Sequence, residues 1–289
     1  MSVRVVERIA EFSQLLDAER RSGHSVGLVP TMGALHDGHG SLVEQAAHDC
    51  HVVAVTIFVN PLQFGADEDL DAYPRTLDAD VKLAEQAGAS IVFAPTVREM
   101  YGDGTCTTVS VASDRTAVLE GASRPGHFDG VATVVAKLFA MAGRCRAYFG
   151  EKDFQQLAIV RRMAADLSFP VEVVPCATVR ADDGLALSSR NAYLTDDERR
   201  AAPVLHRALR AGASAVAAGR DPESVMAAEL ATEPLVEPEY AVVVDAATLQ
   251  RPADLVGDLR LLVAARLPSA RLIDNLGVTV SDGMHRKDS

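Results

Sequence analysis

The stretch Val29–Leu42, VPTMGALHDGHGSL, decides the fold class of this chain. The apolar run Val26–Val29 predicts a buried strand, and Ser41–Asp49 predicts a helix. Between them lie a glycine-containing turn and two histidines, His36 and His39. A strand, a glycine-rich turn and a helix in this order are typical of proteins that bind a nucleotide phosphate at the helix N-terminus, where imidazoles can donate further hydrogen bonds.

The histidine pair has two other interpretations, an incidental surface feature or two zinc ligands. No third ligand stands nearby at a suitable spacing, and the glutamate of a His-Glu-x-x-His helix is absent, which disfavours zinc. No Gly-x-Gly-x-x-Gly follows a strand and no Gly-Lys-Ser/Thr ends a loop, which disfavours a redox dinucleotide and a P-loop kinase. The phosphate interpretation therefore leads.

Composition and charge indicate a globular enzyme for small molecules. The 289 residues are 48% hydrophobic, enough for a large core, and the formal net charge of -12 argues against an extended nucleic-acid surface. The four cysteines form no Cys-x-x-Cys pair, so we expect reduced thiols. We expect no secretion signal and no membrane span, because no suitable apolar run is present, and hence a cytoplasmic protein.

Predicted strands and helices alternate through the first 180 residues. Further strands are predicted at His51–Val59, Ser90–Ala94, Arg146–Phe149 and Val171–Val174, and further helices at Val6–Arg21, Asp78–Ala87, Val131–Met141 and Asp153–Leu167. This alternation predicts an α/β fold, a Rossmann-like and mainly parallel sheet with helices on both faces. Ligands of such sheets bind beyond the carboxyl ends of the strands. We therefore expect the ligand site of residues 1–180 to lie at that edge of the sheet.

A smaller α+β domain is expected over residues 181–289. It is predicted to contain a long alanine-rich helical region from Asp196 and strands at Tyr240–Asp245, Leu259–Ala265 and Arg271–Asn275.

Two loops after predicted strands carry polar side chains. In FVNPLQFG, the amides of Asn60 and Gln63 can recognise hydroxyls and carboxylates, although Asn60-Pro61 is also a common turn. In YFGEKDFQQL, Lys152 can oppose phosphate charge and Gln156 can reach the same cleft, while Asp153 is also a plausible helix cap.

Two further segments are candidates. LALSSRNAYL offers two hydroxyls and the Arg190 guanidinium, which suit an oligophosphate. LEGASRPGHFDGVATVV either shapes the acid pocket through Glu120, Arg124 and His127 or is a turn in which Asp129 caps the next helix, and these two interpretations are equally favoured.

Six blocks in order resemble the pantoate:β-alanine ligase family of nucleotidylyltransferase-like Rossmann proteins. They are PTMGALHDGH, FVNPLQFG, YPRT, RPGHFDGVATVV, FGEKDFQQL and LALSSRNAYL. The resemblance implies condensation of pantoate with β-alanine at the expense of ATP, through a pantoyl adenylate, with release of pyrophosphate and AMP. It also implies that residues 1–180 bind ATP and pantoate, that Mg²⁺ binds with ATP, and that the chain forms a homodimer; it does not fix the ligands of Mg²⁺. Because the adenylate is reactive, we expect residues 181–289 to close as a lid that protects it from water.

The resemblance also implies roles for individual residues. Gln63 and Gln156 would bind pantoate, with Asn60 beside them, and His39, His36, Lys152 and Arg190 would be catalytic. The ATP site would comprise Met32, Gly33, Ala34, Leu35, His36, Asp37, Gly38, His39, Gly150, Glu151, Lys152, Asp153, Val179, Leu187, Ser188, Ser189 and Arg190.

One departure from the family pattern is Gly40, where a larger residue is usual and where glycine weakens the helix start. Two rival functions remain at this point. They are another nucleotidylyltransferase of the same fold, which would lack the Gln63–Gln156 pair, and a non-catalytic adenine-nucleotide sensor.

Overall fold

The computed structural model describes residues 3–65, 70–71, 73–104 and 107–281. The chain divides into two compact units. The first comprises residues 1–151 and 155–177, and the second comprises residues 152–154 and 178–289. A short turn after residue 151 thus belongs to the second unit, although its neighbours in sequence on both sides belong to the first.

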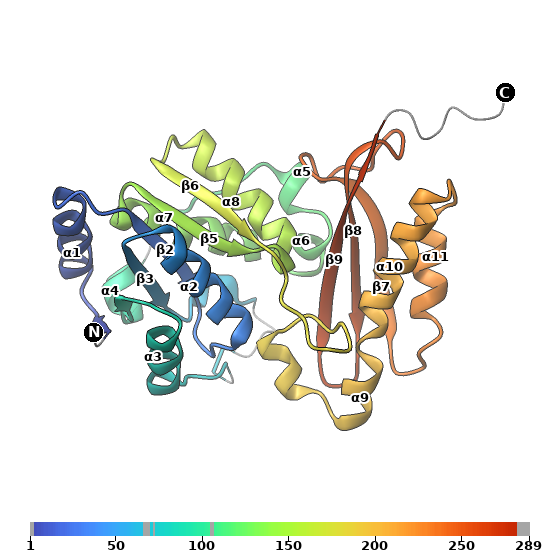
Figure 1. The fold of residues 1–289 in the computed structure, drawn as a ribbon, viewed down its shortest axis with the longest axis horizontal. Coiled ribbons are helices and arrows are strands. Elements are labelled where there is room, and N and C mark those ends of the chain that lie inside the picture. Colours follow the sequence, from blue (N-terminus) through green and yellow to red (C-terminus); the bar gives the residue numbers. More distant parts are fainter. Residues whose placement is uncertain (1–2, 66–69, 72, 105–106, 282–289) are drawn as a thin grey trace. The chain divides into compact units, whose positions relative to one another are not determined.

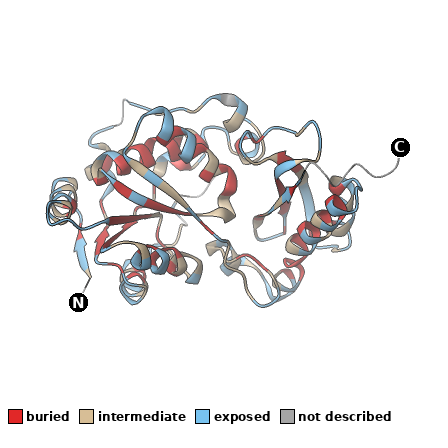
Figure 2. Ribbon diagram, turned by 45° about the horizontal axis from the view of Figure 1, so that its top comes forward, coloured by how far each residue is buried: buried red, intermediate tan, exposed pale blue. Residues whose placement is uncertain are grey.

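The first unit is built on a six-stranded sheet in which every pair of neighbours is parallel (Figure 1). The strands are β1 (Arg4–Val6), β2 (Val26–Thr31), β3 (Val52–Ile57), β4 (Ile91–Phe93), β5 (Cys145–Gly150) and β6 (Val171–Cys176), in the order β1-β4-β3-β2-β5-β6. The predicted parallel α/β fold is confirmed. The central strands β2 and β3 are buried over most of their length (Figure 2), which explains their uninterrupted apolar sequences.

Helices cover both faces of this sheet. The helical elements between β1 and β6 are α1 (Ile9–Arg21), α2 (Asp37–Asp49), η1 (Pro61–Gln63), α3 (Leu77–Gln86), α4 (Val97–Tyr101), α5 (Ser113–Thr116), α6 (Glu120–Ser123), α7 (His127–Ala142), η2 (Glu151–Asp153) and α8 (Phe154–Asp166). Val92 of β4 packs with Leu42 and Ala84 of α2 and α3. The next residue, Phe93, stacks on Phe12 of α1 with ring centroids 4.4 Å apart. Because successive strand residues point to opposite faces, α1 lies across the sheet from α2 and α3.

The strand order places a topological switch point between β2 and β5. From β2 the chain runs through β3 to β4 on one side, and it then returns to add β5 and β6 on the other side of β2. In open α/β sheets, ligands bind beyond the carboxyl ends of the strands at such a point. The carboxyl ends of β2 and β5 lead directly into the histidine turn and into the GEKD turn.

The second unit has an antiparallel sheet, β7-β8-β9, of strands Glu237–Asp245, Gly257–Arg266 and Arg271–Val280. Its helices are η3 (Ser189–Tyr193), α9 (Asp196–Ala201), α10 (Val204–Ala217) and α11 (Pro222–Leu230). The side chains of α10 and α11 form one apolar core with the sheet, which includes Leu205, Leu209, Met226, Leu261 and Val263. Among the helices of the described residues, none has the length and apolar character needed to cross a membrane.

Three predictions about elements were wrong. The helix expected from Val6 begins at Ile9, because Arg4–Val6 instead pairs with β4, and three residues are too few to show a strand period. The helix expected from Ser41 begins four residues earlier, at Asp37. The long alanine-rich region is three helices, interrupted at Pro203 and again before Pro222, where Asp221 caps α11.

Candidate active site

The two histidines cap the N-terminus of α2. His36 is the N-cap residue, and its Nδ1 accepts a hydrogen bond from the Gly38 N–H at 3.1 Å. Nδ1 of His39 accepts from the His36 N–H at 3.3 Å, which completes a capping box. The ring centroids lie 4.2 Å apart. In a neutral imidazole whose Nδ1 accepts, the proton is on Nε2, so backbone capping sets both rings to the tautomer with a donor at Nε2.

A buried carboxylate holds the turn that precedes the histidines. Asp80 of α3 is 2% exposed, and its two oxygens accept from the backbone N–H groups of Ala34 (3.0 Å) and Leu35 (2.8 Å). Gly33 lies within this turn at φ +86°, and a Cβ there would lie 3.1 Å from Asp80 Oδ2, so the close approach requires glycine. Asp80 was not predicted from the sequence. One feature of the sequence could have indicated it: Asp80 lies four residues before Ala84, so an acidic side chain falls on the apolar face of the predicted helix.

Asn60 and Gln63 form a buried amide pair after β3. Asn60 is fully buried, and its Oδ1 accepts from the Leu62 N–H and the Tyr101 hydroxyl. Its Nδ2 therefore donates, to the Gly130 carbonyl and to Gln63 Oε1 at 2.9 Å. Because Gln63 must present its oxygen to Asn60, its Nε2 is the end that carries donors outward, and no described residue accepts from it.

The Gln63 backbone is held by the segment that leads into α7. The Gln63 carbonyl accepts from Arg124 Nη2 at 3.2 Å and lies 2.9 Å from His127 Nδ1. A Cβ on Gly130 would come within 2.0 Å of the Leu62 carbonyl oxygen, so α7 touches η1 directly. The sequence favoured equally a pocket-shaping loop and a simple turn for the segment before α7. These contacts support the first interpretation, because the segment shapes the Gln63 loop. Asp129 does not cap α7, whose N-cap residue is Gly126.

Two neighbouring glutamines on α8 have different environments. Gln155 is 3% exposed, and its side chain bonds three backbone groups between α5 and the start of α6, the carbonyls of Arg115 and Val118 and the N–H of Glu120. Gln156, the predicted ligand, is half-buried. The bonds of Gln155 identify it as a structural support, and no sequence pattern distinguished the two residues.

The second unit contains the remaining predicted residues. Residues 179–187 form a hairpin, named here the 179–187 hairpin, in which the Leu187 N–H donates to the Val179 carbonyl at 2.9 Å. Val179 and Leu187, which were predicted separately for the ATP site, are thus joined by a backbone hydrogen bond. Ser188 follows and caps η3 through its hydroxyl, which accepts from the Arg190 N–H at 3.3 Å.

The other predicted residues lie at the ends of elements. Met32 follows β2, the exposed Asp37 opens α2, Gly150 ends β5, and Glu151, Lys152 and Asp153 form η2, immediately before α8. Ser189 opens η3. Lys152 Nζ lies 3.4 Å from Asp153 Oδ1. The structure therefore brings together the histidines with the Asp80-held turn, and Val179 with Leu187.

Among the described residues, no group of three or more His, Cys, Asp or Glu side chains gathers in a way that could hold a metal ion.

A parallel sheet with its switch point beside a histidine-capped helix N-terminus defines a Rossmann-like nucleotide-binding protein. The sequence profile described as "Pantoate-beta-alanine ligase" matches residues 4–277. The chain belongs to the pantoate-β-alanine ligase family.

Individual relatives agree over nearly the whole length. The chain is 53% identical over 279 residues to the pantothenate synthetase of Dinoroseobacter shibae, covering 95% of this chain and 99% of the relative. A crystal structure of pantothenate synthetase from Thermus thermophilus is similar, with a TM-score of 0.90, 49% identity and coverage of 95% and 99%. A crystal structure of the Francisella tularensis pantoate-β-alanine ligase, complexed with beta-gamma ATP and β-alanine, has a TM-score of 0.77, 30% identity and coverage of 95% and 97%.

Proposed function

We propose that this chain condenses pantoate with β-alanine to form pantothenate, using ATP and releasing AMP and pyrophosphate. The observation that carries the proposal is the pair of Nε2–H imidazoles capping α2 at the β2/β5 switch point, in a chain of this family. The ATP and β-alanine complex of the Francisella tularensis relative supports the same substrates here.

In the first step, a pantoate carboxylate oxygen attacks the α-phosphorus of Mg–ATP, and the bond from that phosphorus to the bridging oxygen of pyrophosphate breaks. The product is pantoyl adenylate. We propose that the Nε2–H groups of His36 and His39 donate to phosphate oxygens and that Lys152 and Arg190 supply positive charge. Donors fixed in advance stabilise developing oxyanion charge without reorganisation, so capping of both rings by the backbone serves the reaction.

Pantoate is proposed to lie against Gln63 and Gln156. The Nε2 group of Gln63 suits an oxygen acceptor such as a pantoate hydroxyl or carboxylate, because Asn60 already occupies its Oε1. Asn60 was predicted as a substrate ligand. Its amide is committed to four protein groups, so we now propose that it orients Gln63 instead.

In the second step, the β-alanine amine attacks the acyl carbon of the adenylate, the bond from that carbon to the AMP oxygen breaks, and the amine loses a proton. The adenylate is reactive toward water, and we propose that residues 181–289 close as a lid to protect it. Mg²⁺ is proposed to enter with ATP and to be held largely by phosphate oxygens and water.

We further propose a cytoplasmic homodimer, as expected for the family. The described cysteines Cys50, Cys145 and Cys176 are free thiols, which fits a reducing compartment; Cys106 lies outside the described residues.

Isotope exchange between pyrophosphate and ATP tests this function. We expect exchange only when pantoate is present, and AMP release only when β-alanine is added. Exchange without pantoate would indicate another nucleotidylyltransferase, and ATP binding without exchange would indicate a nucleotide sensor. His39→Ala and Lys152→Ala are each expected to lower kcat about 100-fold or more. Turnover near that of the wild type in either variant would remove that residue from the mechanism.

A further inference from the structure

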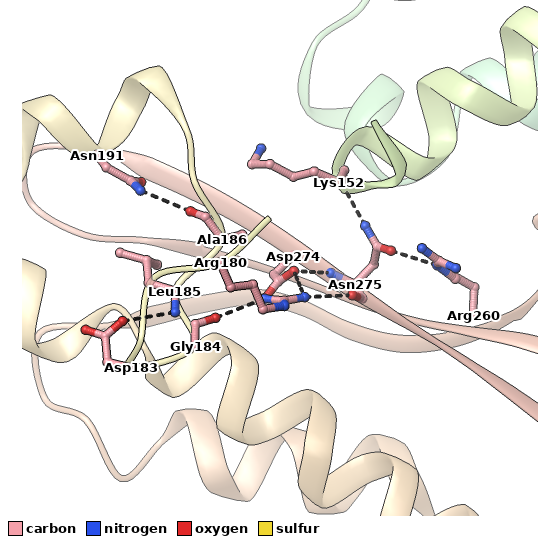
Figure 3. Close-up of polar contacts among 10 residues, drawn as sticks. All are labelled: Lys152, Arg180, Asp183, Gly184, Leu185, Ala186, Asn191, Arg260, Asp274 and Asn275. Carbon is pink, nitrogen blue, oxygen red and sulfur yellow. Dashed lines mark hydrogen bonds and ion pairs between the residues drawn. The ribbon is translucent and has the colours of Figure 1, made fainter. Parts of the chain in front are cut away.

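A strand of the second unit binds the backbone of the proposed catalytic lysine. Asn275 of β9 is 3% exposed, and its Nδ2 donates to the Lys152 carbonyl oxygen at 2.7 Å (Figure 3). Lys152 lies in the turn of residues 152–154, which belongs to the second unit, while residues 151 and 155 belong to the first. The lysine and its turn therefore belong to the second unit, although the residues that flank the turn in sequence belong to the first.

The orientation of the Asn275 amide is fixed. Arg260 Nε donates to Asn275 Oδ1 at 2.7 Å, so the oxygen must face Arg260 and the NH₂ group must face Lys152. The Arg260 guanidinium carbon also lies 4.1 Å from the ring centroid of Phe154. Arg260 and Asn275 thus contact the residues that flank Asp153 in sequence, Arg260 through the Phe154 ring and Asn275 through the Lys152 carbonyl.

The preceding residue holds the segment that leads to Arg190. Asp274, 3% exposed, accepts two bonds from Arg180, at 2.6 and 2.9 Å. Arg180 also donates to the Gly184 carbonyl at 3.0 Å and to the Asn275 carbonyl at 3.3 Å. Arg180 pairs with Ala186 across the 179–187 hairpin, so the ion pair fixes the hairpin on β9. Asn191 Nδ2 then bonds the Ala186 carbonyl at 3.0 Å and ties η3 to the same hairpin.

We propose that the adjacent residues Asp274 and Asn275 are positioning residues that hold Lys152 and the Leu187–Arg190 segment in one fixed mutual geometry. The inference rests on the proposed function, in which both segments supply groups to the phosphates of ATP. A lysine on a flexible turn would lose entropy on reaching the phosphate, whereas a turn fixed on β9 has already lost part of it. The bidentate geometry at Asp274 adds directional restraint to the hairpin.

Asn275→Asp is the discriminating substitution. It keeps the shape and the acceptor for Arg260 but replaces the N–H donor with an oxygen that faces the Lys152 carbonyl. Asn275→Ala removes the donor without adding charge. We expect both to lower the pantoate-dependent exchange rate by about tenfold or more. Thr279→Val is the matched control, because it removes an exposed side-chain bond to Asp258 in the same β8–β9 pair; it should leave the rate within about twofold.

A double-mutant cycle separates positioning from general damage to the fold. If Asn275 acts through Lys152, then Asn275→Asp in a Lys152→Ala background lowers the residual rate by less than about twofold. The proposal would be overturned if Asn275→Asp lowered the rate by the same factor in the Lys152→Ala background as in the wild type. An Asn275→Asp single variant with the wild-type exchange rate would also overturn it.

Hydrogen–deuterium exchange tests the attachment without any activity. In Asn275→Asp we expect faster exchange in peptides covering residues 150–156, and no such change in Thr279→Val. Unchanged protection of that peptide would overturn the attachment even if the protein is active. If the wild type lacks pantoate-dependent exchange, the proposed function fails, whereas the deuterium result still decides whether Asn275 holds the turn.

Discussion

Asp80→Asn should weaken the hydrogen bonds by which α3 holds the turn before His36. Both carboxylate oxygens accept backbone N–H groups, from Ala34 and Leu35, and one also accepts from the Thr76 hydroxyl at 3.1 Å. Asparagine has the same shape but keeps only one acceptor oxygen, so one buried N–H would face an NH₂ group. An unsatisfied buried donor costs about 1–3 kcal/mol, and the remaining bonds lose their charge assistance. We expect the free energy of unfolding to fall by about 3 kcal/mol.

Activity should fall further than stability alone explains. The turn positions the N-cap His36, and a displacement of about 1 Å at a reacting group can cost roughly 100-fold in rate. Urea denaturation would measure the stability, and pantoate-dependent pyrophosphate exchange under folding conditions would measure the rate. Asp78→Asn is the matched control, because it removes the same charge from the same first turn of α3 at an exposed position. If Asp80→Asn and Asp78→Asn behave alike in both assays, the proposed role of Asp80 is wrong.

Three other changes test separate parts of the structure. Gly40→Ala should stabilise α2 by up to about 1 kcal/mol in urea denaturation, with unchanged turnover, because the added Cβ would meet Leu83 at an ordinary 3.5 Å; a loss of stability would contradict this. Gly130→Ala should raise KM for pantoate more than KM for ATP, because its Cβ would displace η1; equal changes in both would argue against a pantoate role for this loop. Burial and the nearby Arg180 lower the pKa of His206, while Asp274 acts in the opposite direction. The unfolded chain therefore binds the proton more readily than the folded chain, and the free energy of unfolding falls as the pH drops below about 6.5. Between about pH 7 and pH 5, the melting temperature of His206→Gln should therefore fall by less than that of the wild type. Equal losses would exclude His206 as a contributor.

The sequence was sufficient for the parallel α/β fold because its central strands are apolar runs separated by segments of helical pattern. β1 could not be found in this way. Its three residues form a strand only because β4 supplies the partner. The early start of α2 was missed for a chemical reason, since histidine is not among the usual N-cap residues, and here both the cap and its reciprocal partner are imidazoles.

The supporting residues of the site were harder to predict than the proposed ligands. Most of the proposed ligands lie in turns after strands or in the first turn of the following helix, where their position alone is informative. Asp80, Gln155 and Asn275 lie within helices and a strand, and their roles come from backbone groups brought close by the fold. Asn60 is the opposite case, because its side chain lies in a polar loop after a strand but its amide bonds four protein groups.

The central claim is attack by the pantoate carboxylate on the α-phosphorus of ATP. It is tested most directly by running the complete reaction with pantoate labelled with ¹⁸O in its carboxylate and analysing the AMP by mass spectrometry. Transfer of one labelled oxygen to the phosphate of AMP is the result that an adenylate intermediate requires. Unlabelled AMP, formed at the same rate as pantothenate, would contradict the account.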